Sequence, residues 1–380
     1  MTIHKEIIVC KRCLSDSNDQ RITFDDDGIC NFCERYDIDK ENFYFVDKNG
    51  KEKFSEIVNK IKKNANGPYD CIMGLSGGVD STYLAYLLKE FDLNVLAVHV
   101  DAGWNTEIAV GNIQKIIKYT GYDLETIVLE WGDIRSLQVA CLRAQIMNQD
   151  IVQDHAFFSA LYKLAKDLKI GYVMTGSNMQ TEGVWGYYGH SAMDSKYLKN
   201  VFKKFGKGKV KNYPFTNFLN YYFFYPYFHK IKPLKPFNYL GYNKTEAQLA
   251  LIEKVGYTPY KYKHGESVWT RFFQDYYLIK KFNYDKRKIH LSSQLFNGDM
   301  SRSEALNVLK EDPYDYALFD YDVSYISRKL ELSVEEFLSL LNPLEKDPPD
   351  FKSNERLYKF IKFLQKVVEK ALPVKLSNYS

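Results

Sequence analysis

The residues most able to do chemistry lie in the stretch CIMGLSGGVDSTYLAYLL, which runs from Cys71 to Leu88. An apolar run ends at Leu75, a Ser-Gly-Gly turn follows, and Asp-Ser-Thr then opens a helical pattern. Backbone amides at a helix start point at an anion, and adjacent glycines leave no side chain between the backbone and bound oxygens. Hydroxyls of Ser76 and Ser81 add donors, so the stretch predicts a phosphate-binding loop. Neither the common P-loop pattern nor G-x-G-x-x-G is present in it.

Four of the six cysteines form a second candidate centre near the N-terminus. Their pattern is C-x2-C-x16-C-x2-C, a spacing that places two thiolates on each of two turns around a tetrahedral ion. A closed site of four thiolates is structural rather than catalytic, and paired thiols suit a reducing compartment. The pattern predicts a structural zinc site formed by Cys10, Cys13, Cys30 and Cys33.

The composition is that of a globular protein with a full core. The chain has 380 residues, 45% of them hydrophobic, and its 52 basic and 48 acidic residues leave a net charge of +4. This near balance gives no global electrostatic case for nucleic acid as the main ligand. No stretch of about 18 apolar residues occurs, so we expect a cytoplasmic protein without a membrane span.

Alternating apolar runs and helical patterns surround the glycine loop. Such alternation is typical of an α/β fold with a parallel, doubly covered sheet, in which ligands bind beyond the carboxyl ends of the strands. The loops after Leu75, Asp101 and Gly176 should therefore converge. The expected strands are residues 69–75, 94–101, 125–130 and 172–176, and the expected helices between them are residues 81–90, 107–119 and 157–168.

The organisation along the chain predicts three parts: a zinc module at 1–47, an ATP-binding α/β domain at 48–240 and a helical region at 241–380. In the last part, helical patterns carry expected caps at Thr245, Ser301 and Ser333. An uncharged aromatic stretch at 212–228 is broken by two prolines, which argues against a spanning helix. We favour packing between domains for it over a membrane-surface or sugar-stacking role.

The ordered set S-G-G-V-D-S at residues 76–81 resembles the signature of the PP-loop ATP pyrophosphatases, which have a HUP-like fold. The resemblance implies that the loop cradles the β,γ-pyrophosphate of ATP while the α-phosphate is attacked. It also implies that Asp80 helps to hold Mg²⁺, since a carboxylate beside a polyphosphate needs a cation between them. The ATP-binding residues it implies are Ser76, Gly77, Gly78, Asp80, Ser81, Thr82, Asp101, Thr175, Gly176 and Asn178.

A second resemblance concerns the acceptor. The segments QDIVQDHAFFSALYKLA, TGSNMQTEG and KHGESVWTRFFQDYYLIKKFNYDKRKIHLSS, together with the double C-x-x-C, are similar to the bacterial N-acetyl sugar amidotransferases. That family makes lipopolysaccharide O-antigens, related surface glycans and nonulosonic acids. The resemblance implies adenylation of the N-acetyl carbonyl oxygen of a nucleotide-activated sugar, then replacement of that oxygen by ammonia-derived nitrogen, with release of AMP and pyrophosphate.

Two residue sets are candidates for the acceptor chemistry. Basic side chains around aromatic residues suit a nucleotide-sugar diphosphate or a carboxylate; these are Arg271, Lys280, Lys281, Lys286, Arg287 and His290. Proton transfer needs titratable groups near the matched segments, although spacing alone places none of them. Beside Asp80, the catalytic candidates are Asp154, His155, Glu182 and His264.

The sequence encodes no glutaminase. Residue 2 is a threonine rather than a nucleophilic cysteine, and neither Cys71 nor Cys141 lies in a nucleophile-elbow context. The family resemblance implies a separate glutaminase of the histidine-biosynthesis type that supplies ammonia, with free ammonium as a second nitrogen source.

Two other interpretations remain open at this point. A PP-loop tRNA thiolase would use the same loop, but after the zinc ligands only Cys71 and Cys141 remain, too few for a three-cysteine iron-sulfur cluster. A non-catalytic nucleotide-binding subunit is the other alternative, and AMP release in a single turnover would exclude it.

Overall fold

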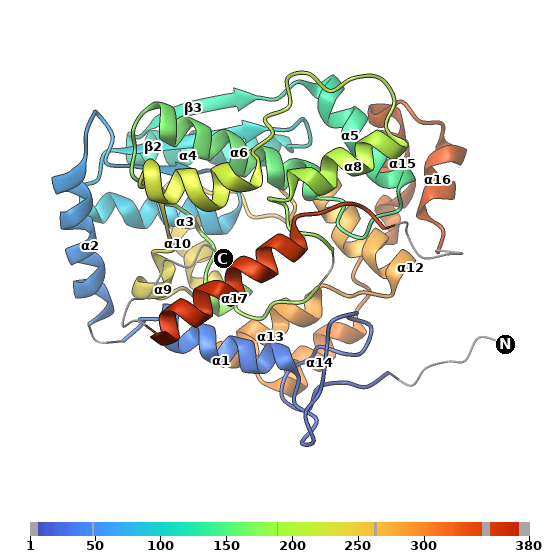
Figure 1. The fold of residues 1–380 in the computed structure, drawn as a ribbon, viewed down its shortest axis with the longest axis horizontal. Helices are drawn as coiled ribbons and strands as arrows, with labels where there is room; N and C mark the ends of the chain where they lie inside the picture. Colours follow the sequence, from blue (N-terminus) through green and yellow to red (C-terminus); the bar gives the residue numbers. More distant parts are fainter. Residues whose placement is uncertain (1–6, 48, 188, 262–263, 344–349, 372–380) are drawn as a thin grey trace.

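A parallel β-sheet forms the centre of the computed structural model, which describes residues 7–47, 49–187, 189–261, 264–343 and 350–371 (Figure 1). In this described part the strand order is β3-β2-β1-β4-β5, and all neighbouring strands are parallel. The predicted α/β class is therefore confirmed. The strands are β1 (Cys71–Gly74), β2 (Val95–Asp101), β3 (Asp123–Val128), β4 (Tyr172–Met174) and β5 (Lys232–Leu234).

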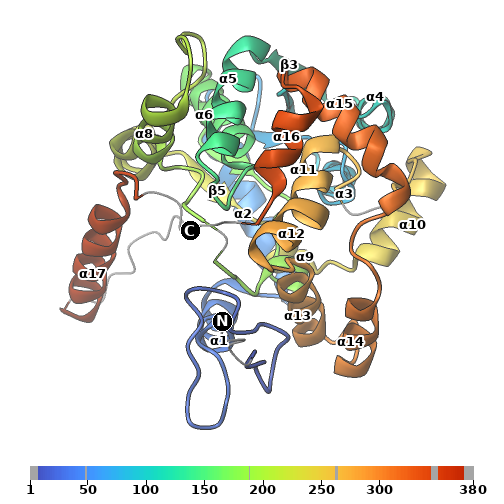
Figure 2. The same cartoon turned by 90° about the vertical axis from the view of Figure 1, so that its right-hand side faces the viewer.

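Helices surround this sheet and make up most of the C-terminal third (Figures 1 and 2). The helices of the first 240 residues are α1 (Asn31–Phe43), α2 (Gly50–Asn64), α3 (Val79–Leu88), η1 (Lys89–Phe91), α4 (Glu107–Thr120), α5 (Trp131–Arg143), α6 (Ile151–Asp167), α7 (Met179–Glu182), α8 (Ser195–Phe205), the π-helix η2 (Asn220–Phe228) and α9 (Phe237–Leu240). Those that follow are α10 (Lys244–Val255), α11 (Val268–Phe272), the π-helix η3 (Phe273–Tyr277), α12 (Leu278–Phe282), α13 (Arg287–Asn297), α14 (Arg302–Lys310), η4 (Tyr316–Leu318), α15 (Phe319–Leu330), α16 (Val334–Leu341) and α17 (Glu355–Ala371).

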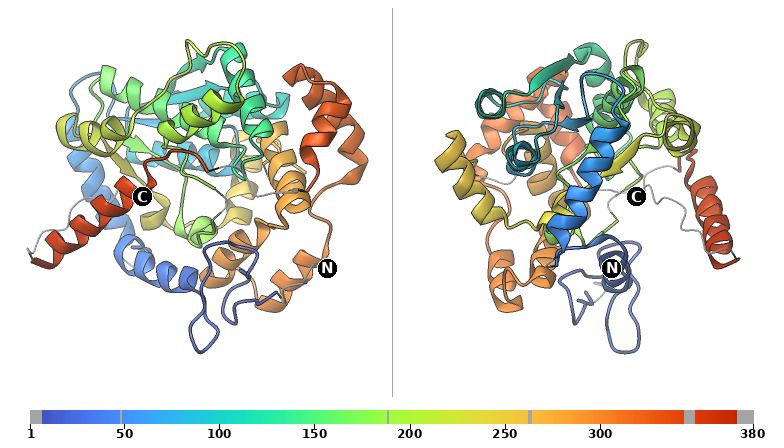
Figure 3. Two further views of the ribbon diagram at one scale, coloured as in Figure 1. Left: turned by 45° about the vertical axis from the view of Figure 1, so that its right-hand side comes forward. Right: turned by 90° about the vertical axis from the view of Figure 1, so that its left-hand side faces the viewer.

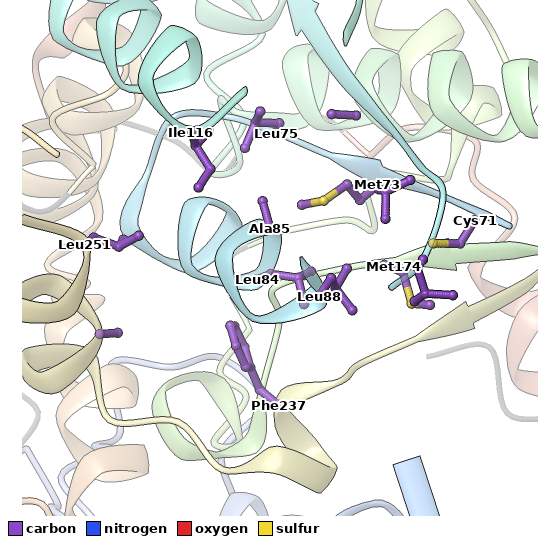
Figure 4. Close-up of a cluster of buried hydrophobic side chains, with 14 of the residues drawn as sticks. Cys71, Met73, Leu75, Leu84, Ala85, Leu88, Ile116, Met174, Phe237 and Leu251 are labelled. Carbon is purple, nitrogen blue, oxygen red and sulfur yellow. The ribbon is translucent and has the colours of Figure 1, made fainter. Parts of the chain in front are cut away.

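Successive side chains of a strand point to opposite sides, and the central strands β1 and β2 are largely buried on both faces, whereas the edge strand β3 is largely exposed. In β1, Cys71 and Met73 join a core with α2, α3, α4 and α10, whereas Ile72 between them joins a core with α6. Figure 4 shows the first of these cores, with Leu84 and Leu88 of α3 close to Met73. This double cover fixes the register of the sheet and with it the position of every loop at its carboxyl edge.

The four predicted strands are present, and β5 was not predicted. Its central residue is Pro233, which lacks a backbone donor and argues against a strand in a sequence pattern. Lys232–Leu234 nevertheless pairs with β4 at the sheet edge, where one side of the strand needs no partner. The helix α5 was also missed, because its apolar residues follow Trp131 and Gly132 without a recognisable cap.

The C-terminal region is helical as predicted, and it packs on the α/β domain rather than apart from it. Helix α10 packs against α3, and α11, η3, α12, α15 and α16 form a core with Trp104 and Leu142. Ser301 and Ser333 cap their helices as predicted, Ser301 in a capping box with Glu304. The predicted cap at Thr245 is wrong: the side chain of Asn243 accepts from the backbone N–H groups that follow it.

The cysteine-rich N-terminal segment docks on the C-terminal helices. Leu14 packs with Leu291 of α13 and Ala305 of α14, and its backbone N–H donates to Ser292 Oγ at 2.9 Å. Arg302 of α14 donates to the carbonyl oxygens of Cys13 and Cys10. This small module thus completes its core with side chains of α13 and α14.

The aromatic stretch is divided between the core and the surface. Tyr213 and Tyr225 are buried, Tyr225 against Tyr162 of α6, and these two residues fit the predicted packing role. Phe223 and Phe228, in contrast, lie exposed on η2. Among the described residues, no helix is long and apolar enough to cross a bilayer.

Candidate active site

The glycine loop between β1 and α3 forms an anion nest. Gly77 has a φ of +80° and Gly78 is the N-cap of α3, whose first turn has no side-chain cap. The free N–H groups of that turn therefore face the loop. The hydroxyl groups of Ser76 and Ser81 lie 3.0 Å apart, and Thr82 Oγ1 donates to the Gly78 carbonyl at 2.7 Å. These contacts fix the conformation of the loop.

Gly77 is required for this shape, and we expect alanine there to be severe. A Cβ at Gly77 would lie 2.5 Å from the carbonyl oxygen of Ala109 on α4, and the positive φ adds strain. We expect Gly77→Ala to lower ATP turnover by about 10²-fold and stability by about 2–3 kcal/mol. Gly121, which caps the same helix at a φ of +76°, has no atom within 4 Å, so Gly121→Ala should cost only about 1 kcal/mol and leave turnover unchanged. Urea unfolding and pyrophosphate release measure both effects, and equal effects of the two variants would contradict the assignment.

The loop after β2 forms a second wall. Asp101 Oδ1 accepts from the Gly103 backbone N–H at 2.7 Å and from Asn105 Nδ2 at 2.9 Å, so this carboxylate fixes the loop itself. Asn105 Nδ2 also lies 3.0 Å from His99 Nε2. The backbone N–H of Thr106 donates to the Glu266 carbonyl at 3.0 Å. The loop after β2 is thereby tied to the start of the C-terminal region.

The loop after β4 approaches the start of α3 closely. A Cβ on Gly176 would lie 3.1 Å from the carbonyl carbon of Asp80, so a larger residue would force the two segments apart. Asn178 is buried and caps α7 by accepting from the Thr181 backbone N–H at 2.9 Å. The Ser177 backbone N–H donates to Thr175 Oγ1 at 3.2 Å. The three loops that sequence reasoning brought together thus do meet at the carboxyl edge of the sheet.

Carboxylates gather around the glycine loop. Tyr242 donates its hydroxyl hydrogen to Asp80 Oδ1. Burial raises the pKa of Tyr242 far above its ordinary value, and the charges of Asp80 and Glu182 raise it further. Burial lowers the pKa of Lys235, and the charge of Glu182 acts in the opposite direction. Asp80, Glu182, Tyr242 and Lys235 therefore form one cluster at the start of α3.

Glu266 adds a carboxylate from the C-terminal region. A Cβ on Gly78 would lie 3.6 Å from the carboxyl carbon of Glu266, so Glu266 lies directly against the glycine loop. Burial acts to raise the pKa of Glu266, but the hydrogen bond and charge of His264, at 3.3 Å, outweigh it and lower the pKa. His264 in turn lies 6.3 Å from the His290 ring, whose Nδ1 is 3.3 Å from the Thr181 carbonyl oxygen. Sequence reasoning missed Tyr242 and Glu266, although HGES was part of a matched segment.

A pair of aspartates, the buried Asp150 and the partly buried Asp154, lies at the N-terminus of α6. Asp150 accepts from Thr270 Oγ1 and from Gln274 Nε2, both at 3.2 Å. Burial raises the pKa of Asp150 to about 6 and that of Asp154 to about 7; the neighbouring Asp150 also raises the latter, and Lys286 lowers both. Because α6 runs back to the amino end of β4, its N-terminus faces the carboxyl edge of the sheet. Thr270 follows Glu266 by four residues, so the pair lies near the glycine loop.

Several predicted site residues have side chains that contact other parts of the fold. His155 Nδ1 lies 2.6 Å from the Ala192 carbonyl oxygen and its Nε2 accepts from the Thr216 backbone N–H at 3.1 Å. Burial lowers the pKa of His155 to about 4. With both ring nitrogens bound to the backbone, this histidine has the contacts of a structural residue.

The predicted basic set is dispersed in the same way. Arg271 is buried and donates to Asp322 at 2.7 Å, and Lys281 donates to the carbonyl oxygens of Leu340 and Asn342 at the end of α16. Arg287 pairs with Asp285 and binds carbonyl oxygens at the end of α14. Lys280 is exposed on α12. Of the six, the structure brings only Lys286 and His290 to the candidate site.

The four cysteines lie together, apart from the glycine loop. Their sulfur atoms all lie within 4.8 Å of one another, and all four residues are buried. Backbone N–H groups of Arg12, Cys13 and Cys30 donate to Cys10 Sγ at 3.3 to 3.5 Å, the arrangement that stabilises a thiolate. This donor set and its buried, closed geometry suit a structural metal ion such as zinc.

Comparison with known proteins gives two family matches that divide the chain. Residues 51–213 match the NAD synthase family, and residues 266–366 match the family described as LPS (lipopolysaccharide) biosynthesis protein WbpG-like, C-terminal domain. An uncharacterized protein of Methanocaldococcus jannaschii is 27% identical over 191 residues, which are 48% of this chain and 61% of the relative. The chain thus spans about three-fifths of the length of that curated relative.

Two solved structures are also similar. The U34-tRNA thiolase NcsA from Methanococcus maripaludis with its 4Fe-4S cluster is 17% identical with a TM-score of 0.32, over 68% of this chain and 75% of that one. The NH3-dependent NAD synthetase from Campylobacter jejuni in complex with nitrate is 18% identical with a TM-score of 0.30, over 54% of this chain and 82% of that one.

Proposed function

Because the chain belongs to the WbpG-like LPS biosynthesis proteins of the PP-loop superfamily, we propose that it is an ATP-dependent amidotransferase that acts on an N-acetyl sugar. The substrate is a nucleotide-activated N-acetyl sugar of lipopolysaccharide O-antigen or related glycan synthesis, and the product carries an acetamidino group. The coarser part of this statement, an ATP-using enzyme, follows from the PP-loop ATP pyrophosphatase fold alone.

One observation carries the proposal: the WbpG-like segment meets the glycine loop. Glu266, the first residue of that match, lies against Gly78, and Thr270 binds the Asp150 carboxylate. A loop suited to the phosphates of ATP is thereby bounded by residues of the segment that matches the LPS biosynthesis family. The acceptor amide would then lie between the loop and the N-terminus of α6.

The reaction we propose has two steps. The acetamido carbonyl oxygen attacks the α-phosphorus, the bond from that phosphorus to the bridging oxygen breaks, and pyrophosphate leaves. Ammonia then attacks the imidate carbon, and AMP leaves with the former carbonyl oxygen. Ser76, Gly77, Gly78, Ser81 and Thr82 bind the leaving pyrophosphate in this scheme, and the loops of Asp101 and of Thr175, Gly176 and Asn178 border the nucleotide.

The carboxylate cluster fits a bound Mg²⁺. Asp80 and Glu182 both act on Tyr242 beside an anion nest, and two carboxylates there would repel ATP without a cation. We assign them to hold Mg²⁺, which when bound would neutralise charge on the phosphates. His264 fixes Glu266 against the loop, and Lys235 adds a cation to the cluster.

Ammonia is supplied from outside this chain in the proposal. A separate glutaminase of the histidine-biosynthesis type is the donor that the family resemblance implies, and free ammonium is the second source. Cys71 and Cys141 are fully buried, and burial raises the pKa of both thiols well above the ordinary value. Neither suits a nucleophile, which also speaks against the tRNA thiolase alternative.

The test of the proposal incubates the purified chain with Mg-ATP, ammonium and a panel of UDP- and CMP-linked N-acetyl sugars. We expect AMP and pyrophosphate to form only with an accepted sugar, whose mass should fall by about one unit as oxygen is replaced by NH. Release of ADP and orthophosphate, or pyrophosphate release that no sugar stimulates, would contradict the proposal.

Asp154 is the group that we assign to accept a proton from the attacking nitrogen. Because the pKa of Asp154 is raised to about 7 in the folded chain, folding takes up a proton on this carboxyl between about pH 4 and pH 7. The protonated carboxyl stabilises the fold at low pH, and this stabilisation is lost as the pH rises through about 7. We expect kcat/KM to rise with pH through about 7, and we expect Asp154→Asn to abolish this rising part (limb) of the pH–rate profile. The variant should also gain about 2 kcal/mol over the native chain between pH 5 and pH 8, measured by urea unfolding.

The matched control for Asp154 lies on the same helix. Asp167 is paired with Lys163, whose hydrogen bond lowers its pKa, so Asp167→Asn should change neither the pH limb nor the stability difference. A pH profile that Asp154→Asn leaves intact would refute the role of Asp154.

A further inference from the structure

The apolar face of α17 points away from the protein. Only one ring contact of this helix with the body is present among the described residues, between Tyr358 and Tyr222 at 5.3 Å. Figures 2 and 3 show α17 standing off the body at one edge of the molecule. Its exposed apolar residues include Phe360 and Phe363, which are 57% and 62% exposed. Among the side chains of α17 that the structure describes, the exposed apolar set is Leu357, Phe360, Ile361, Phe363, Leu364 and Val367.

The aromatic residues of η2 extend this apolar face. η2 lies beside α17, since Tyr222 of η2 makes the contact with Tyr358. Phe228 is 65% exposed and Phe223 is 48% exposed, although both are large apolar side chains. The exposed residues of this second set are Leu219, Phe223, Phe224, Tyr227 and Phe228. We call the two sets together the α17 face.

The chain around η2 is strongly basic. Residues 195–245 contain eleven lysines and no aspartate or glutamate, where the average of the chain would give about six acidic residues. Lys203 is exposed on α8, and its neighbour Lys204 donates to the Asp350 carbonyl oxygen just before α17, so α8 borders the α17 face. Lys230 is exposed directly after η2. In Figure 1, α8 and α17 lie on the same front of the molecule.

We propose that the α17 face rests on an anionic lipid surface. An amphipathic helix with phenylalanine and leucine on one side, together with neighbouring lysines, is the pattern of a helix that lies in a membrane interface. At 17 residues, α17 is about 25 Å long, enough to place several turns on the surface. The lysines complement anionic headgroups, and the apolar side chains enter the acyl boundary.

The charges favour lipid over the other occupants of such a face. A second copy of the chain would bring the same lysines together, and like charges at an interface oppose association. RNA would bind the lysines and stack on the aromatic rings, but it would gain no favourable contact from the exposed aliphatic side chains. These are Leu357, Ile361, Leu364 and Val367. An acid-free segment beside an aliphatic face fits both parts of an anionic bilayer.

The experiment is flotation of the full chain with vesicles of phosphatidylcholine alone or mixed with phosphatidylglycerol. We expect binding to the anionic vesicles only, weakened by salt. Phe360→Ser with Leu364→Ser should lower the partition constant at least about tenfold, and Lys203→Gln with Lys230→Gln about fivefold for each lysine. The control is Leu249→Ser, a residue of α10 that is 61% exposed; α10 lies at the edge of the molecule opposite α17 (Figure 2), so this variant should bind as the native chain does.

Three results would overturn the proposal. The first is no binding of the native chain to anionic vesicles. The second is a dimer in sedimentation that Phe360→Ser dissociates, because a second copy would then cover the face. The third is retention of tRNA at physiological salt that the lysine variants abolish, together with no vesicle binding. Circular dichroism of each variant confirms that the fold is intact, and the lysine pair tests the proposal independently of α17.

Discussion

Asp80→Asn is expected to lower the rate of pyrophosphate release from ATP by about 10³-fold, while the chain folds and retains zinc at the four cysteines. Asparagine keeps the size of the side chain and an oxygen that can accept from Tyr242. What it removes is the negative charge in the first turn of α3, where the backbone N–H groups have no side-chain cap. In our account that charge holds the cation on which the phosphates depend, so the loss should appear in kcat/KM.

The control for Asp80 is Glu90→Gln in η1, which follows α3 directly. Glu90 is half exposed and lies beyond the opposite end of the helix from the glycine loop, so the same change of charge should alter turnover less than twofold. Pyrophosphate release measured at saturating Mg-ATP compares the two variants. If Asp80→Asn retained turnover within a factor of three, the assigned role of Asp80 would be refuted.

Cys30→Ser is expected to have the largest effect on structure. It removes one of four sulfur atoms that lie within 4.8 Å of one another, so zinc affinity should fall on the order of 10²-fold or more. The module has little apolar core beyond its contact with α13 and α14, and without metal its segment should open. Zinc per chain should fall from about one to near zero, and proteolytic cleavage within the first 47 residues should accelerate about tenfold.

Cys141→Ser separates metal loss from the loss of any buried thiol. Cys141 is fully buried in the core formed by α5 and α8, so this variant should lose some stability but keep its zinc and its resistance to cleavage at the N-terminus. A full complement of zinc in Cys30→Ser, or equal cleavage of the two variants, would show that the four cysteines are not a metal site.

The local parts of the site were predictable from the sequence because their signals are local. The serines and glycines from Ser76 to Ser81 define a turn and a helix start within six residues, and the C-x-x-C pairs need only two turns of chain. The carboxyl-edge rule then brought the loops after β1, β2 and β4 together without knowledge of side-chain contacts. Glu266 and Tyr242 reach the loop from the C-terminal third, and no spacing relates them to it.

The basic residues show the opposite case, because a dense run of cations in the sequence does not reveal which of them are free to bind a substrate. Arg271, Lys281 and Arg287 form part of a dense cationic stretch in the sequence, yet each has a partner from a distant segment: Asp322, the end of α16 and the end of α14. A cation needs its counter-group in space rather than in sequence, and only the fold shows which cation already has one. His155 is the same, since its two partners lie 37 and 61 residues away.

The most direct test of the central claim follows one oxygen atom. A UDP- or CMP-linked N-acetyl sugar from the panel, carrying a heavy-oxygen label in its acetamido carbonyl, is turned over with Mg-ATP and ammonium, and the AMP is examined by mass spectrometry. The account predicts that the label moves from the sugar to the phosphate of AMP, one atom per turnover. Unlabelled AMP, or label retained in the sugar product, would contradict it.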